Sequence, residues 1–268
     1  MNLTGSISKS LPAIKLSAPG SEAEVQAILF DKDGTLMDFI YTWGSWGEQL
    51  LARFSTALNL QGLPVLPDNL LGMWGIDYDE NGKISGYDRN SPLSMGTVHD
   101  LLILLALEGY KAGLSWAEAK MLAEQCRCEA DEALERLRVA RLLPGVQSFL
   151  EACRQSGIKL GIVTSDETEA ANKHLDWLGI RDYFDVVVGA DLVRLGKPYP
   201  DMVELACREM GLAVEHTAVI GDTNGDMQMA RAAGAALAIG LDEGRVSGQK
   251  GYPAAHSVVE GYGELRLG

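Results

Sequence analysis

A short apolar run that leads straight into two acids most constrains the fold of this chain. Residues 27–30 read Ala-Ile-Leu-Phe, and Asp31, Lys32 and Asp33 follow before a Gly-Thr turn. The run predicts a strand covered on both faces of a parallel sheet, where ligands bind beyond the carboxyl ends of the strands. Alternation in an extended backbone places Lys32 on the opposite face, as a supporting or rim residue. Adjacent carboxylates indicate a metal or an acid–nucleophile pair, or else a solvated Asp-Gly turn.

Two later segments place phosphate-binding groups after predicted strands. Residues 159–163 predict a strand that ends at Thr164 and Ser165. Hydroxyls and exposed backbone N–H groups suit a phosphate. Lys197 follows another apolar run and precedes a proline, and it offers a point charge for phosphate.

The last of these segments completes an ordered set of motifs. Residues 218–221 predict a strand that leads into Asp222 and, four residues on, Asp226. The set, DxDGT then threonine then Lys-Pro then GDxxxD, resembles the four motifs of the haloacid dehalogenase superfamily, in particular its phosphatase branch. The resemblance covers residues 25–35 and the chain from 144 onward.

The resemblance implies a catalytic role for five of these residues. Asp31 aligns with the nucleophile that becomes an aspartyl-phosphate. Asp33 aligns with the general acid and base that protonates the leaving alcohol and then activates water. Thr164, Ser165 and Lys197 match the groups that hold the transferring phosphoryl. Because true dehalogenases lack an acid at the position of Asp33, the pattern favours phosphate esters.

The resemblance also implies a Mg²⁺ cofactor. Asp222 matches a carboxylate ligand, which supplements the Asp31 carboxylate and the backbone carbonyl of Asp33. Asp226 matches an outer position that orients the metal waters or Lys197. An oxygen-only ligand set is what Mg²⁺ prefers, so the chemistry agrees with these assignments.

The function expected from these motifs is Mg²⁺-dependent hydrolysis of a small phosphorylated metabolite, phosphoglycolate-like, through an aspartyl-phosphate. A large cap closes such a site and excludes macromolecules. One alternative is a phosphomutase of the same superfamily, similar to β-phosphoglucomutase, which would use the same residues and differ in its cap. The other is a non-catalytic module that binds calcium or another metal.

The spacing of the motifs predicts the domain organisation. About 130 residues separate the first two motifs, whereas parallel strands need only a dozen or so to connect. We expect a Rossmann-like three-layer α/β core with a parallel sheet over residues 25–37 and 144–268. A helical cap is expected at residues 38–143, and a disordered or loosely docked tail at residues 1–24.

The segment expected to form the cap is predicted to be mostly helical, with one loop or hairpin at residues 77–88. Three segments have helical spacing or composition: residues 43–58, 97–111 and 115–138, the last opened by a capping box. Residues 77–88 imitate a calcium loop but end in Asp rather than in the bidentate Glu of that motif. An Asn-Gly hairpin is the favoured interpretation.

Composition excludes several other classes of function. The formal net charge of −14 disfavours nucleic-acid partners, and no apolar run approaches the ~18 residues of a membrane span. The four cysteines lack CxxC spacing, which indicates free thiols in a reducing compartment and a cytoplasmic enzyme. The four scattered histidines favour packed or surface positions over zinc. The pattern does not determine the oligomeric state.

Overall fold

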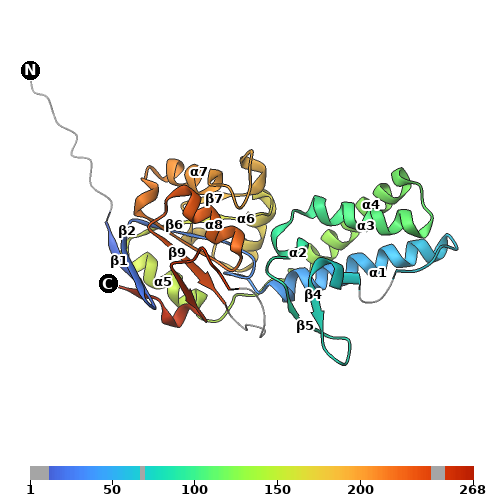
Figure 1. Cartoon of the computed structure of the whole chain (residues 1–268), viewed down its shortest axis with the longest axis horizontal. Coiled ribbons are helices and arrows are strands. Elements are labelled where there is room, and N and C mark those ends of the chain that lie inside the picture. The colour runs from blue at the N-terminus through green and yellow to red at the C-terminus, as the bar shows by residue number, and fades with distance from the viewer. Residues whose placement is uncertain (1–11, 67–69, 243–250) are drawn as a thin grey trace, which may run out of the picture.

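The computed structural model describes residues 12–66, 70–242 and 251–268. A parallel sheet forms one lobe, and a mostly helical region forms a second lobe beside it (Figure 1). The strands of the sheet, in the spatial order β10-β9-β8-β3-β6-β7, are β10 (Ser257–Val259), β9 (Leu237–Leu241), β8 (Thr217–Gly221), β3 (Ala27–Phe30), β6 (Lys159–Val163) and β7 (Val186–Val188). The expected α/β class with a parallel sheet is confirmed.

Helices cover both faces of this sheet. They are α5 (Val146–Ser156), α6 (Thr168–Trp177), α7 (Asp201–Met210) and α8 (Asn224–Ala233). Side chains alternate along β3, so Ile28 and Phe30 pack in the hydrophobic cluster that includes α5 and α6. Ala27 and Leu29 pack in the opposite cluster with α7 and α8. All four are fully buried, which explains the continuous apolar run and gives the three layers predicted.

The strand order reverses at β3. From β3 the chain passes to β6 and β7 on one side of the sheet, and then to β8, β9 and β10 on the other. Phe30 pairs in register with Ile162 of β6 and with Ile220 of β8, so the three strands end at the same level. Connections diverge at such a point and leave a crevice at the carboxyl ends of the strands. Asp31 and Asp222 therefore enter the same crevice.

Residues 14–25 form two paired strands, which corrects that part of the loosely docked tail expected over residues 1–24. Three antiparallel strands form a second sheet: β1 (Ile14–Ala18), β2 (Ser21–Val25) and β11 (Arg266–Leu267). Leu16 and Val25 are fully buried in the core cluster, which anchors the hairpin. The alternating runs on each side of Pro19-Gly20 were the signal, since Gly20 takes φ +73° in the turn. Residues 1–11 lie outside the described residues.

The second lobe, here called the cap, has its own hydrophobic cluster. Its elements are η1 (Ile40–Gly44), α1 (Ser45–Leu60), η2 (Leu70–Trp74), β4 (Ile76–Tyr78), β5 (Ile84–Tyr87), α2 (Pro92–Met95), α3 (Val98–Ala112) and α4 (Trp116–Leu137). Trp46, Phe54 and Leu105 lie at its centre and are almost fully buried. Ser115 and Glu118 form the predicted capping box at the start of α4. The expected helical character of the insert agrees with these elements.

The segment that imitates a calcium loop forms a hairpin. β4 and β5 pair antiparallel, and Oδ1 of Asp79 accepts the backbone N–H groups of Asn81 and Lys83. The favoured hairpin interpretation is confirmed.

Short 3-10 turns complete the core: η3 (Arg181–Tyr183), η4 (Ala190–Leu192), η5 (Val214–His216) and η6 (Tyr262–Glu264). Over the described ranges, no helix combines the length and apolarity needed to cross a bilayer.

Candidate active site

Asp31 lies directly after β3 and is held by a lysine. Nζ of Lys197 contacts Oδ1 of Asp31 and lies 2.7 Å from Oδ1 of Asp226. Burial raises the pKa of Asp31 well above its ordinary value, and Lys197 opposes that rise. Burial also disfavours the charge on Lys197, but Asp226 and Asp31 outweigh it and raise the pKa of the lysine. Lys197 is therefore a fixed positive charge against the Asp31 carboxylate.

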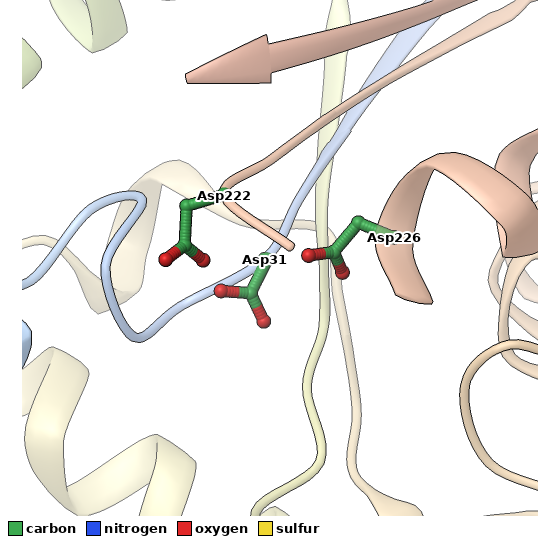
Figure 2. Close-up of side chains that lie close together, drawn as sticks. All are labelled: Asp31, Asp222 and Asp226. Atoms are coloured by element: carbon green, nitrogen blue, oxygen red, sulfur yellow. The ribbon is translucent and has the colours of Figure 1, made fainter. Parts of the chain in front are cut away.

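Three carboxylates converge at this edge of the sheet. One oxygen from each of Asp31, Asp222 and Asp226 lies within 4.8 Å of the others, and Figure 2 shows the three side chains turned toward a common space. Thr223 caps α8, and Oδ2 of Asp226 accepts its backbone N–H at 3.0 Å. Gly34 has φ +77°, and a Cβ there would lie 2.2 Å from Oδ2 of Asp222. Glycine at this position therefore lets the loop after β3 approach the cluster.

The donor set fits a divalent cation. Three buried carboxylates this close repel one another, and burial raises the pKa of Asp222 to about 7. An oxygen-only set is the preference of Mg²⁺. Of the predicted ligands, the structure brings Asp31 and Asp222 together and adds Asp226, which the sequence had placed in an outer position. The Asp33 carboxylate is not part of the cluster.

A small pocket of about 30 Å³ lies beside the carboxylates. It is lined by Asp31, Asp33, Ser94, Met95, Thr164, Ser165, Lys197 and Thr223. The pocket thus joins the predicted catalytic residues with the predicted phosphate-binding ones. Ser94 and Met95 come from α2 of the cap, and sequence reasoning missed them. Ser91 and Pro92 are signals for the start of a helix, but nothing local indicates that this turn faces Asp31.

Asp33 is held by two donors of its own. Nε1 of Trp43 donates to Oδ1 of Asp33 at 2.7 Å, and Nζ of Lys32 lies 2.6 Å from Oδ2. Burial raises the pKa of Asp33, but Lys32, His174 and Trp43 together outweigh that effect, and the net shift is downward. Lys32 was expected to be a supporting residue or a residue at the rim of the site. Because its side chain is fully buried, it does not lie at the rim and is a supporting residue for Asp33.

Lys32 is the centre of a buried polar network. Its Nζ lies 3.0 Å from Nδ1 of His174 and 3.4 Å from Oδ2 of Asp166. Burial, followed by the Lys32 charge, lowers the pKa of His174 to about 3, so the ring is a neutral acceptor. Burial raises the pKa of Asp166 to about 6. Sequence reasoning missed this network because His174 is 142 positions from Lys32.

The cap also contacts Asp222 directly. The hydroxyl of Tyr87 donates to Oδ2 of Asp222 at 2.9 Å, and Nε of Arg89 lies 3.6 Å from the same oxygen. Nη1 of Arg89 donates to Oδ1 of Asp242 at 2.5 Å, and the hydroxyl of Tyr252 donates to the backbone oxygen of Asp222 at 2.8 Å. The end of β5 and the residues that follow it therefore dock on the loop that carries Asp222. Sequence reasoning missed these residues.

Comparison with known proteins adds a family and a fold. The family model described as haloacid dehalogenase-like hydrolase matches residues 25–234. A phosphoglycolate phosphatase of Yersinia pseudotuberculosis is 28% identical over 225 residues, which are 82% of each chain. The phosphoglycolate phosphatase of Escherichia coli K12 is 27% identical over 233 residues, 79% of each chain.

Solved structures show the same fold at lower identity. A predicted phosphoglycolate phosphatase from Haemophilus somnus 129PT superposes with a TM-score of 0.58 at 23% identity, covering 85% of this chain and 88% of that one. A putative β-phosphoglucomutase from Thermotoga maritima gives a TM-score of 0.60 at 22% identity, covering 88% and 94%. Each similarity spans both lobes of the molecule.

Proposed function

We propose that this chain hydrolyses a small phosphorylated metabolite through an aspartyl-phosphate on Asp31, with Mg²⁺ as cofactor. The chain belongs to the haloacid dehalogenase-like hydrolases and is a phosphatase of that superfamily. One observation carries this proposal. Asp31 lies in the same pocket as Thr164, Ser165 and Lys197, so a nucleophile and phosphate-binding groups share one small space. The phosphatase relatives provide independent support.

In the first step, an oxygen of Asp31 attacks phosphorus and the bond to the leaving alcohol breaks. A carboxylate nucleophile divides one difficult hydrolysis into two displacements. Lys197 already contacts Asp31, so its charge adjoins the phosphoryl oxygens as they gain negative charge. The Thr164 and Ser165 hydroxyls line the same pocket and are donors for those oxygens.

Asp33 transfers protons in both steps. The alcohol oxygen takes a proton from Asp33 in the first step. In the second step Asp33 takes a proton from water as the water oxygen bonds to phosphorus, and the bond between phosphorus and Asp31 breaks to release phosphate. Trp43 and Lys32 fix the Asp33 carboxylate, and its lowered pKa favours the ionised form that acts as base. The acid role therefore requires a proton to reach Asp33 before the alcohol leaves.

The carboxylates of Asp31, Asp222 and Asp226 would hold Mg²⁺. A bound Mg²⁺ supplies positive charge that neutralises the phosphoryl group and holds it in place. Lys197 balances the remaining negative charge on Asp31 and Asp226. Tyr87 orients the Asp222 carboxylate from the cap.

The test is a phosphate-release screen of phosphorylated metabolites with Mg²⁺, run on the wild type, on Asp31→Asn and on Asp176→Asn. Asp176 is an exposed aspartate of α6 and serves as the matched control. We expect release with the wild type and the control but none with Asp31→Asn, because an amide cannot form an acyl phosphate. Acid-quenched wild type should carry a phosphoryl group on the peptide that contains Asp31.

Two results would contradict the proposal. If Asp31→Asn released phosphate at the same rate as the wild type, Asp31 could not be the nucleophile. Conversion of a sugar phosphate into its isomer, without release of phosphate, would assign the same site to a phosphomutase. The shared superfamily would be retained in either case.

A further inference from the structure

A second, larger cavity adjoins the active-site pocket. This groove of about 690 Å³ lies between the cap and α6, which Figure 1 shows on the cap-facing side of the core. Ser165 lines both the groove and the small pocket. Trp43 lines the groove and donates to Asp33, which lines the pocket. An alcohol that leaves beside Asp33 therefore has the groove as its adjoining space.

An aromatic row runs along the groove from the cap to α6. The ring centroids of Trp46 and Trp43 are 5.4 Å apart, and those of Trp43 and His174 are 6.2 Å apart. The row ends at Trp177, 4.9 Å from His174. With its pKa lowered to about 3 by burial, His174 adds no positive charge to this wall. Faces of Trp rings attract cations.

The groove is strongly acidic. Seven carboxylate side chains line it against two cationic ones, Arg127 and Lys173. Arg127 pairs with Glu124 and Asp131, while Lys173 lies 3.5 Å from Glu135 and 3.4 Å from Glu169. Both cations are therefore already balanced by carboxylates, and an anionic group that entered the groove would meet an excess of negative charge.

One carboxylate of the lining is buried and ion-paired inside the wall. The side chain of Asp166 is only 8% exposed, and it lines the groove beside Ser165. Within the described part of the chain, Oδ2 of Asp166 accepts no hydrogen bond, although Lys32 Nζ lies 3.4 Å away and His174 Nδ1 lies 3.6 Å away. The ion pair of Asp166 with Lys32 therefore lies buried behind the wall of the groove and is out of reach of a ligand there.

We propose that the groove binds the leaving group of the substrate and that this leaving group is an alcohol bearing an ammonium group. The carboxylate excess and the aromatic row both attract such a cation. The carboxylate of a phosphoglycolate-like ester would be repelled by the same surface. The inference rests on the proposed phosphatase activity at Asp31 and names its substrate class.

The test compares esters that differ in one group. Aminoethyl phosphate, hydroxyethyl phosphate and phosphoglycolate share a two-carbon alcohol, and glucosamine 6-phosphate differs from glucose 6-phosphate by one amine. We expect kcat/KM for each ammonium ester to exceed that of its neutral partner by about fivefold, as for a cation–π contact at a partly open site. Phosphoglycolate should be the poorest of the three small esters.

Variants of the lining should shift this ratio in opposite directions. Asp131→Asn combined with Glu135→Gln removes two carboxylates and should bring the ammonium-to-neutral ratio close to one. Asn keeps an oxygen for the bond from Trp46. Lys173→Gln removes a cation and should raise the ratio. Glu132→Gln is the control, because Glu132 is exposed on α4 and is not in the lining.

A binding measurement separates this inference from the proposed function. Calorimetric titration of Asp31→Asn with Mg²⁺ present should show tighter binding of aminoethyl phosphate than of phosphoglycolate. Equal affinities, or a ratio of kcat/KM that the variants leave unchanged, would overturn the ammonium assignment while phosphatase activity stands. Absence of hydrolysis of every ester would instead overturn the proposed function, and the binding preference would still decide the ligand class.

Discussion

Trp43 donates its indole N–H to Oδ1 of Asp33 at 2.7 Å, and this bond ties the first helical turn of the cap to the proposed general acid. Lys32 holds the other oxygen of Asp33, and its Nζ lies 5.8 Å from the centroid of the Trp43 ring. The three side chains therefore fix one another. Trp43 is a positioning residue in this arrangement, since it acts on the reaction through Asp33.

Trp43→Phe should lower kcat by about tenfold with little change in KM, because the loss of a hydrogen bond to a charged group costs ~1.5 kcal/mol or more. Phenylalanine keeps an aromatic ring between η1 and the groove. Steady-state kinetics on hydroxyethyl phosphate, whose leaving group carries no ammonium, would measure both constants. A proportional rise in KM at constant kcat would point to a role in substrate binding instead.

Trp116→Phe is the matched control for this prediction. Trp116 is 43% exposed at the start of α4, and its ring contacts Tyr110 rather than the active site. We expect its kinetic constants to equal those of the wild type. Thermal unfolding of both variants would show whether a loss of rate has a structural origin.

The sheet and the principal site residues were predictable from sequence because their signals are local. Strands covered on both faces leave continuous apolar runs, and the residue after each run lies at the crevice. The order of the sheet then brings Asp31, Thr164 and Asp222 together without further information. The capping box of Thr223 and Asp226 is equally local, and it begins α8 at Asn224.

The cap side of the site was not predictable, because it depends on how two lobes meet. Tyr87 reaches Asp222 across 135 positions in the chain, and Arg89 also lies close to Asp222. Ser94 and Met95 line the pocket from a helix of four residues. No periodicity encodes which surface of an inserted lobe faces the core. The burial of Lys32 was missed because its partner His174, on α6 of the core, is 142 positions away in the chain.

Chelation should inactivate the enzyme, and Mg²⁺ should restore it. The motivating observation is the cluster of Asp31, Asp222 and Asp226, whose oxygens lie within 4.8 Å of one another. Ca²⁺ should inhibit, because it takes longer bonds and a looser coordination than Mg²⁺. Mg²⁺ should also raise the melting temperature of the chelated protein by binding the folded state. Full activity after chelation would remove the metal from the proposal.

Asp222→Asn provides the matched variant for the metal experiment. It removes one charge from the cluster and keeps an oxygen that accepts from Tyr87. The concentration of Mg²⁺ needed for half-maximal stabilisation should rise in this variant. An unchanged Mg²⁺ requirement would place the cation elsewhere.

Acid should destabilise the fold through His174. Burial lowers its pKa from 6.5 to about 3, so the folded state keeps the ring neutral while the unfolded state takes up a proton. A lowered pKa of this kind contributes stability that is present above pH 6.5 and is lost as the pH falls toward 3. Between pH 6.5 and pH 5 the contribution of His174 to the free energy of unfolding should fall by ~2 kcal/mol.

His174→Gln tests this dependence by urea unfolding at several pH values. Glutamine does not titrate and can still accept from Lys32, so the slope of stability against pH should flatten between pH 6.5 and pH 5. The exposed His99 gives the control His99→Gln, which should retain the wild-type slope. Equal slopes in the wild type and His174→Gln would show that another group causes the acid sensitivity.

Asp33→Asn should separate the roles of the two acids after β3. If Asp33 protonates the leaving oxygen, the variant should slow alkyl phosphates more than aryl phosphates, because a phenolate leaves without much help. Asp31 attacks phosphorus in either case, so its loss should affect both esters alike. The amide keeps an oxygen for the Trp43 bond, so the position of residue 33 should be retained.

The ratio of kcat/KM for an alkyl and an aryl phosphate, measured in the wild type and in Asp33→Asn, checks this prediction. We expect the ratio to fall by about tenfold or more in the variant, within the range typical of general acid catalysis. Loss of the base should also let the aspartyl-phosphate accumulate on the aryl substrate, visible as a burst of phenol. An unchanged ratio without a burst would leave Asp33 as a structural partner of Lys32, because the lowered pKa of Asp33 would then keep it ionised throughout the reaction.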